Sequence, residues 1–107
     1  MITETIHKNA DNKISVELRS NGAAIQDLHS ATKVTIEFGD AVLSSATATA
    51  GAFDFTTYGA TGRLDMKLGH EAAVKAMRNG QYKATLRVFD ATYTNGRFWD
   101  DLIIEVR

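Results

Sequence analysis

Residues 79–107 read NGQYKATLRVFDATYTNGRFWDDLIIEVR, and this stretch decides the kind of fold that the chain adopts. Two runs in which apolar and polar residues alternate flank a turn that contains Asn95 and Gly96. Asn-Gly is a strong signal for a β-hairpin turn, because both residues tolerate a positive φ angle. The stretch therefore predicts two antiparallel strands, each with one face toward a core.

The same period-two alternation recurs along the rest of the chain, with turn signals between the runs. The residues expected to face the core are Ile14, Val16 and Leu18; Val34, Ile36 and Phe38; Leu64, Met66 and Leu68; Tyr82, Ala84, Leu86 and Val88; and Leu102, Ile104 and Val106. About six to eight short strands of this kind are typical of a β-sandwich or barrel built from antiparallel sheets. We therefore expect one all-β sandwich domain over residues 1–107.

Two stretches depart from this alternation. Residues 69–80, GHEAAVKAMRNG, carry Ala73, Val74 and Met77 at helical spacing, with Gly80 beyond the end, so one short helix is expected near residues 70–78. Residues 44–52, SSATATAGA, combine small side chains with hydroxyls. Such thin side chains favour an edge strand or a loop that adds little to the core.

The composition is that of a globular protein. The 107 residues are 44% hydrophobic and 23% charged, and Lys and Arg are scattered at a formal net charge of −1, which argues against nucleic-acid and membrane partners. The absence of cysteine excludes disulfides and thiolate metal sites. The first residues, MITETIHKNADNK, lack the pattern of a signal peptide, and no run reaches the roughly 20 apolar residues of a membrane helix. Synthesis in the cytoplasm is therefore expected.

Histidines and carboxylates are the candidate metal ligands. His7, His29 and His70 lie far apart, without the spacing that places two imidazoles on one helix face. Asp90 and the pair at 100–101 could converge at one end of the last hairpin as oxygen ligands for calcium, but no spaced calcium loop surrounds them, and turn residues are the favoured interpretation. We expect neither a metal nor a cofactor.

Nucleophile and phosphate motifs point away from catalysis. Ser44 and Ser45 lack the Gly-x-Ser-x-Gly elbow of hydrolases. The glycine pattern GATGR at residues 59–63 is followed by a predicted strand, whereas a phosphate loop continues into Gly-Lys-Ser/Thr and a helix. The sequence therefore favours a protein that is not an enzyme.

A family resemblance begins at the quoted stretch. A helical turn, then NGQY, then the alternating run that ends at Asp90 resembles the corner before the F strand of immunoglobulin-like domains. The resemblance implies that Tyr82 is a corner tyrosine, whose hydroxyl bonds to the backbone just upstream. Ala84 stands where disulfide-bonded members have their second cysteine, so only the wider immunoglobulin-like β-sandwich class is implied.

The arrangement of DLHSATKVTIEFGD at residues 27–40, then NGQYKATLRVFD and a terminal strand, is similar to small immunoglobulin-like domains of tailed-phage structural proteins, including baseplate subunits. The resemblance covers about residues 13–107. It implies a virion component in the capsid decoration, neck, tail or baseplate, which assembles with itself or with other virion proteins and is expected to form a homo-oligomer. It carries no catalytic residues.

Aromatic residues leave a second function open. Tyr58, Tyr93, Phe98 and Trp99 lie in or beside predicted turns, where a carbohydrate-binding module would place rings that stack on sugars. The alternative to a virion subunit is therefore an adhesion module that recognises a host-surface glycan.

Three apolar residues of the last hairpin do not fit the inward face. If Leu102 and Ile104 point inward, Ile103 points outward, and strict alternation also turns Trp99 outward and forces the carboxylate of residue 100 inward. A β-bulge at residues 100–101 would instead return Trp99 to the core. Phe89 stands at the end of its strand. We expect Phe89 and Ile103, with Trp99 if there is no bulge, to form an apolar interface patch.

Overall fold

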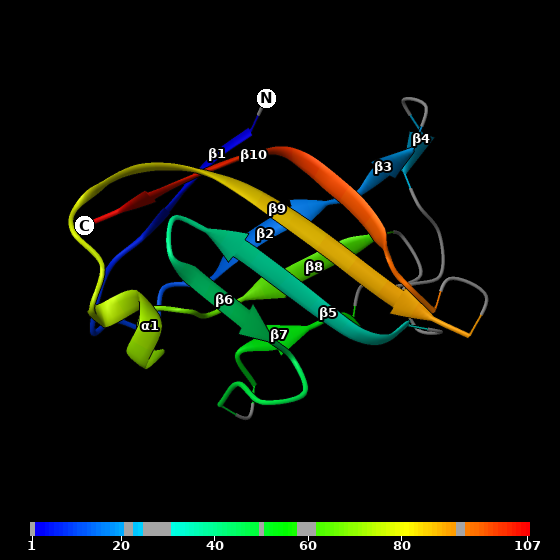
Figure 1. Ribbon diagram of the computed structural model, residues 1–107, viewed down its shortest axis with the longest axis horizontal. Coiled ribbons are helices and arrows are strands. Elements are labelled where there is room, and N and C mark those ends of the chain that lie inside the picture. The colour runs from blue at the N-terminus through cyan, green and yellow to red at the C-terminus, as the bar shows by residue number, and fades with distance from the viewer. Residues whose placement is uncertain (1, 21–22, 25–30, 50, 58–61, 92–93) are drawn as a thin grey trace.

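The computed structural model describes residues 2–20, 23–24, 31–49, 51–57, 62–91 and 94–107, with the backbone alone at residues 19–20, 23–24 and 100–101 (Figure 1). In chain order the elements are β1 (Ile2–Ile6), β2 (Ile14–Glu17), β3 (Arg19–Ser20), β4 (Ala23–Ala24), β5 (Ala31–Phe38), β6 (Ala41–Ser44), β7 (Phe53–Asp54), β8 (Arg63–Met66), α1 (Ala72–Lys75), β9 (Gly80–Asp90) and β10 (Arg97–Val106). The protein is thus mostly β, with one short helix.

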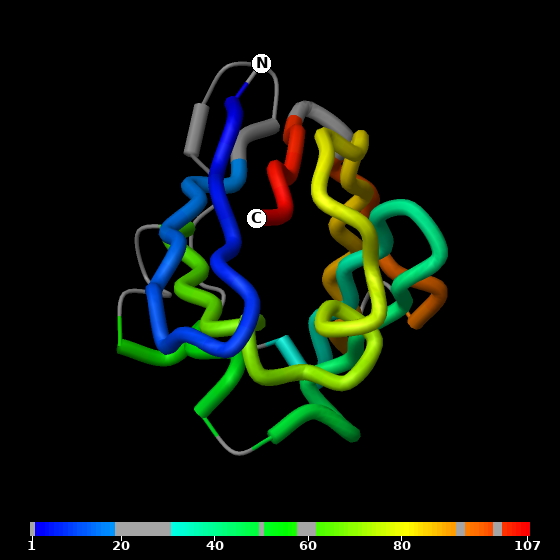
Figure 2. The backbone as a smooth tube through the Cα atoms, turned by 90° about the vertical axis from the view of Figure 1, so that its left-hand side faces the viewer, coloured from blue at the N-terminus to red at the C-terminus, as the bar shows by residue number. Residues whose placement is uncertain are grey.

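Two sheets form the layers of the molecule. The larger has the strand order β1-β10-β9-β5-β6, and the smaller has the order β2-β8-β7. Figure 2 shows them from the side, with the blue and green segments that hold β2 and β8 opposite the yellow and cyan segments that hold β9 and β5. β3 and β4 pair with each other as a separate two-stranded antiparallel ribbon.

The larger sheet is mixed, because β1 pairs with β10 in the parallel direction, with Ile2 beside Leu102 and Ile6 beside Val106. The expectation of purely antiparallel sheets is wrong for this pair. An antiparallel hairpin can be recognised in the sequence by its turn residues. Parallel neighbours lie far apart in sequence and have no tight turn between them. The first and last strands therefore give no local signal that they are partners.

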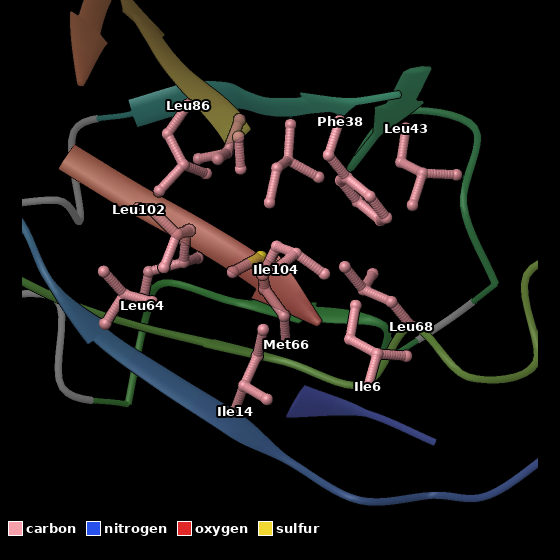
Figure 3. Packing of buried hydrophobic residues seen from close by; sticks show 14 of the residues in the cluster. Ile6, Ile14, Phe38, Leu43, Leu64, Met66, Leu68, Leu86, Leu102 and Ile104 are labelled. Atoms are coloured by element: carbon pink, nitrogen blue, oxygen red, sulfur yellow. The ribbon is translucent and has the colours of Figure 1, made fainter. Parts of the chain in front are cut away.

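The core lies between the two sheets. The residues predicted to face inward on β2, β5, β8, β9 and β10 are buried, except that Tyr82 is half-buried. Figure 3 shows side chains such as Leu86 and Phe38 on one sheet directed toward Leu64 and Met66 on the other. Ile6, Leu68 and Val74 extend this cluster toward the strand ends. Period-two alternation predicts the core because one face of each sheet must be buried.

The hairpin of the quoted stretch is present. β9 and β10 pair antiparallel around residues 91–96, and Gly96 has a φ of 83°, the positive value that the turn requires. The pairing register shifts between Trp99 and Leu102, so one extra residue on β10 forms a β-bulge there. Trp99 consequently shares the inward side with Leu102 and packs, half-buried, against the core.

The helix is shorter than expected. It covers Ala72–Lys75, whereas the sequence predicts residues near 70–78. Glu71 precedes it with an extended backbone and makes no side-chain cap, and the amide of Met77 bonds to the carbonyl of Val74 in a tighter turn. A single turn is unstable alone because nucleation is costly, so the fully buried Val74 side chain holds the helix in place.

The start of β9 is fastened by a side chain. The hydroxyl of Tyr82 donates a 2.7 Å hydrogen bond to the carbonyl oxygen of Arg78. The ring of Tyr82 packs against the core cluster and lies against the Gly39 turn between β5 and β6. This is the upstream backbone bond expected of a corner tyrosine, and it ties the segment after α1 to the large sheet.

Tyr82→Phe is expected to lower the free energy of unfolding by about 1 kcal/mol, because it removes this hydrogen bond and leaves the ring packed. Urea denaturation measures the loss. Arg78→Ala is the matched control, since the acceptor is a backbone carbonyl that the substitution keeps. Equal stability of Tyr82→Phe and the parent would show that the Tyr82–Arg78 hydrogen bond does not stabilise the segment between α1 and β9.

Residues 44–52 behave as the sequence indicates. β6 ends at Ser44 as an edge strand, and a series of turns follows, in which Ala48 bonds to the Ser44 carbonyl. Among the described residues of this stretch, which leave out residue 50, only Ala52 belongs to the buried core. Within the described ranges, α1 falls far short of the length and apolarity that crossing a membrane requires.

Candidate interaction surface

The outer face of the large sheet carries an exposed aromatic ring beside cations. The residues that alternate with the core positions of β9 point away from the core, and among them are Arg87 and Phe89. Phe98 lies opposite Arg87 on β10, and Lys33 lies opposite Phe89 on β5. These four residues, Lys33, Arg87, Phe89 and Phe98, are called the cation–aromatic patch below.

Direct contacts hold the patch together. The guanidinium carbon of Arg87 lies 4.0 Å from the centre of the Phe98 ring and 5.7 Å from that of Phe89. The ammonium of Lys33 lies 4.4 Å from the centre of the Phe89 ring. Cation–π attraction at exposed sites is worth about 0.5 to 1 kcal/mol per pair. Phe98 nevertheless remains 60% exposed, so the patch presents an ordered apolar surface to solvent.

Gly96 makes room for this arrangement. A Cβ atom on Gly96 would lie 2.4 Å from Cγ of Arg87 and 3.1 Å from the Phe89 ring. The positive φ of Gly96 further disfavours any other residue there. The Asn-Gly turn thus serves both the hairpin and the packing of Arg87 across its outer face.

The predicted interface residues are not all brought together. Ile103 is half-buried and pairs with Lys83, six residues before Phe89 on β9, so about 20 Å of strand separates Ile103 from Phe89. The expected single patch of Phe89 and Ile103 is therefore wrong in geometry. The alternating pattern predicted the outward face of Ile103 correctly. It placed Ile103 near the end of β9, beside Phe89, whereas Ile103 lies near the start of β9.

Trp99 does not lie on this outer face either. The bulge turns it toward the core, and the centre of its ring lies 5.6 Å from the guanidinium carbon of Arg97. Phe98 takes the outward position instead. Sequence reasoning did not assign Phe98 to the interface. The acidic pair at residues 100–101 was the sequence signal that could have identified Phe98. A bulge at this pair exchanges the inward and outward faces of the residues before it, so Phe98 points outward and Trp99 inward.

A polar cluster covers the outer side of the small sheet. Asp65 lies on the central strand β8 and is only 4% exposed, although alternation placed it facing solvent. Nε of Arg63 donates to Asp65 at 2.8 Å, and Nζ of Lys13 lies 3.7 Å from it. Burial favours a higher pKa for Asp65, but hydrogen bonds from Arg63 and Ser15 and the nearby positive charges outweigh it, so the pKa is lowered. The carboxylate of Asp65 is thus neutralised by the cations beside it.

Asp54, on the neighbouring strand β7, caps a turn. One of its oxygens accepts the backbone amides of Thr56 and Thr57 at 3.1 and 3.0 Å, and the other accepts the Thr57 hydroxyl at 2.7 Å. The bonds from Thr57 and then Thr56 lower the pKa of Asp54 from 3.8 to about 2. An open groove runs past Asp54, Asp65 and Lys67 on this side.

The low pKa of Asp54 predicts an acid-dependent contribution to stability. Because the folded-state pKa lies below the ordinary value, the ionised carboxylate stabilises the fold above pH 3.8, and this stabilisation disappears as the pH falls toward about 2. Thr57→Val should raise the pKa of Asp54 toward its ordinary value in an NMR titration, because it removes the Thr57 hydroxyl. An unchanged pKa would contradict this account of the turn.

The candidate metal ligands remain dispersed. Nε2 of His70 lies 2.8 Å from a carboxylate oxygen of Asp11 in an exposed pair, and Asp90 pairs with Arg97 at 3.5 Å. His29 and the side chains of residues 100 and 101 lie outside the described part of the chain. Among the side chains that are described, no three of the His, Asp and Glu residues gather as a metal would require. Tyr58 and Tyr93 also lie outside the described residues.

The chain was compared with family models, curated proteins and solved structures, and none of the three comparisons found a match.

Proposed function

We propose that this chain is an immunoglobulin-like β-sandwich that serves as a non-enzymatic structural protein of a bacteriophage particle, in the capsid decoration, neck, tail or baseplate. Its outer sheet face docks onto protein during assembly. The observation that carries the proposal is the cation–aromatic patch, in which Phe98 is held by Arg87 and yet is 60% exposed. Aromatic residues and arginine are the side chains most enriched at protein interfaces.

The strand order supports the immunoglobulin-like class. Strands B, E and D of that class share one sheet and C, F and G the other, and the variable type adds C′ beside C. The orders β2-β8-β7 and β10-β9-β5-β6 match these sets when the strands are taken in chain order. α1 then occupies the E–F connection, and Tyr82 stands at the start of F with its bond to Arg78. β1 departs from the constant type, because it pairs with the last strand.

Detection in the particle tests the proposal. Gradient-purified phage particles from the source culture should contain peptides of this chain at a fixed ratio to the other particle proteins. The same culture's soluble fraction, freed of particles, is the control. Absence of the chain from particles whose other structural proteins are detected would overturn the proposed function.

A glycan-binding module is the second candidate, and the exposed ring of Phe98 favours it, because sugars also stack on aromatic rings beside polar groups. Arg87 already covers one side of this ring, at 4.0 Å. Trp99 follows Phe98 in β10 and reports on its surroundings. We expect its fluorescence to stay unchanged on titration with host-surface glycans. A saturable shift would favour the adhesion module over the virion subunit.

A further inference from the structure

Two positive side chains of the cation–aromatic patch lie beside the same aromatic ring. The ammonium of Lys33 lies 4.4 Å from the centre of the Phe89 ring, and the guanidinium carbon of Arg87 lies 5.7 Å from it. The two cationic centres are therefore at most about 10 Å apart, a distance at which like charges still repel each other at moderate ionic strength. An anion bound between Lys33 and Arg87 would offset this repulsion.

Carboxylates of the chain itself do not neutralise these two charges. Arg97, in the same hairpin, pairs with Asp90 at 3.5 Å. Among the described side chains, by contrast, Lys33 and Arg87 form no ion pair, and the contacts of their charged groups are with aromatic rings. Glu37, the acidic residue of β5, lies two residues beyond the position opposite Arg87. The patch therefore presents two positive charges to whatever covers it.

We propose that the cation–aromatic patch binds an acidic segment of a neighbouring particle protein, with carboxylates of that segment on Lys33 and Arg87 and an apolar side chain over Phe98. The guanidinium of Arg87 lies over the Phe98 ring at 4.0 Å and keeps the N–H groups at its edge for a carboxylate. Phe98 is 60% exposed and offers the apolar contact. This inference rests on the proposed function, because it specifies the partner of the docking face.

The extent of the patch favours a short acidic protein segment over a nucleic acid. A nucleic acid presents a continuous row of phosphates and requires a track of cations along it. Beyond Arg87 on this face, the next row holds Thr85 and Glu37, and the carboxylate of Glu37 would repel a phosphate backbone. An extended segment with acidic residues at alternate positions presents carboxylates about 7 Å apart on one side. That spacing suits two cations at most about 10 Å apart.

Titration with a Glu-Ser-Glu-Ser-Leu peptide, followed by the backbone amide NMR shifts of the free chain, tests the proposed site. The shifts should concentrate at Lys33, Arg87 and Phe98 and should weaken as salt is added. Lys33→Gln and Arg87→Gln should each weaken binding at least about fivefold, because each removes one of the two charge-assisted contacts. Lys67→Gln is the matched control, since this exposed lysine follows β8 in the other sheet, and it should leave the affinity unchanged.

Equal binding of a Gln-Ser-Gln-Ser-Leu peptide, an affinity that neither substitution lowers, or tighter binding of oligothymidylate at the same residues would overturn the inference. In purified particles, a zero-length carbodiimide cross-link should join Lys33 to an acidic residue of another protein. Particles that contain the chain but lack this cross-link would overturn the inference and leave the proposed function standing. Absence of the chain from particles, with glutamate-specific peptide binding intact, would overturn the proposed function alone.

Discussion

Ile36→Ala should lower the free energy of unfolding by about 2 to 5 kcal/mol, the usual cost of removing a large buried side chain and leaving a cavity. Ile36 is fully buried on β5 and pairs with Leu86 on one side and Leu43 on the other. Its side chain thus lies at the centre of the large sheet, where the surrounding strands cannot easily collapse into the space. Urea denaturation of the purified variant measures the change.

Two further variants serve as comparisons for Ile36→Ala. Leu86→Ala, on the neighbouring strand β9, should cost a similar amount because Leu86 is equally buried. Val42→Ala is the control on the same sheet, since Val42 is 66% exposed and should change stability by less than about 0.5 kcal/mol. Costs below half a kilocalorie at both Ile36 and Leu86 would show that the assigned inward face is wrong.

Gly69→Ala should destabilise the protein by about 1 to 3 kcal/mol or more through overpacking against backbone. A Cβ on Gly69 would lie 2.3 Å from the carbonyl oxygens of both His7 and Ala10. The carbonyl of Gly69 accepts the amide of Asn9 at 2.9 Å, so the two segments are bonded where they would clash. The connection from β1 to β2 must therefore move, and thermal unfolding should report the loss.

Gly51→Ala separates this clash from the ordinary cost of replacing glycine. A Cβ on Gly51 would meet nothing within 4 Å, but its φ of 84° disfavours alanine. The expected cost is about 1 kcal/mol, from backbone strain alone. If Gly69→Ala is as stable as the parent, the close approach of the β1–β2 connection to Gly69 is not a constraint on the fold.

The core was predictable because alternation and burial share one physical cause. Leu64 and Met66 alternate with Asp65, and pleating alone sends the first two inward. Asp65 shows the limit of the argument, because its burial comes from Arg63 and Lys13 folding over the outer face. Pattern reasoning identifies the face of a strand, but it does not identify what covers that face.

The interaction surface was less predictable. A single extra residue in β10 decides whether Trp99 points toward the core or toward the outer face. The alternating pattern does not predict this, because a bulge interrupts the alternation of inward and outward residues. The same insertion decides that Phe98 points outward beside Arg87. Similarly, the parallel pairing of β1 with β10 joins the two ends of the chain and has no signature in either strand. The positions on which the proposed docking face depends are thus set by long-range register.

Hydroxyl-radical footprinting of Phe98 tests the central claim most directly, by comparing the free chain with the chain inside purified particles. Phe98 should be labelled readily in the free chain at about its 60% exposure and strongly protected in the particle. His70, which lies in the turn before α1 with a half-exposed side chain, provides the internal reference. Protection of Phe98 relative to His70 is the predicted result. Equal labelling of Phe98 in both samples would contradict the claim that the outer face of the large sheet is the docking face.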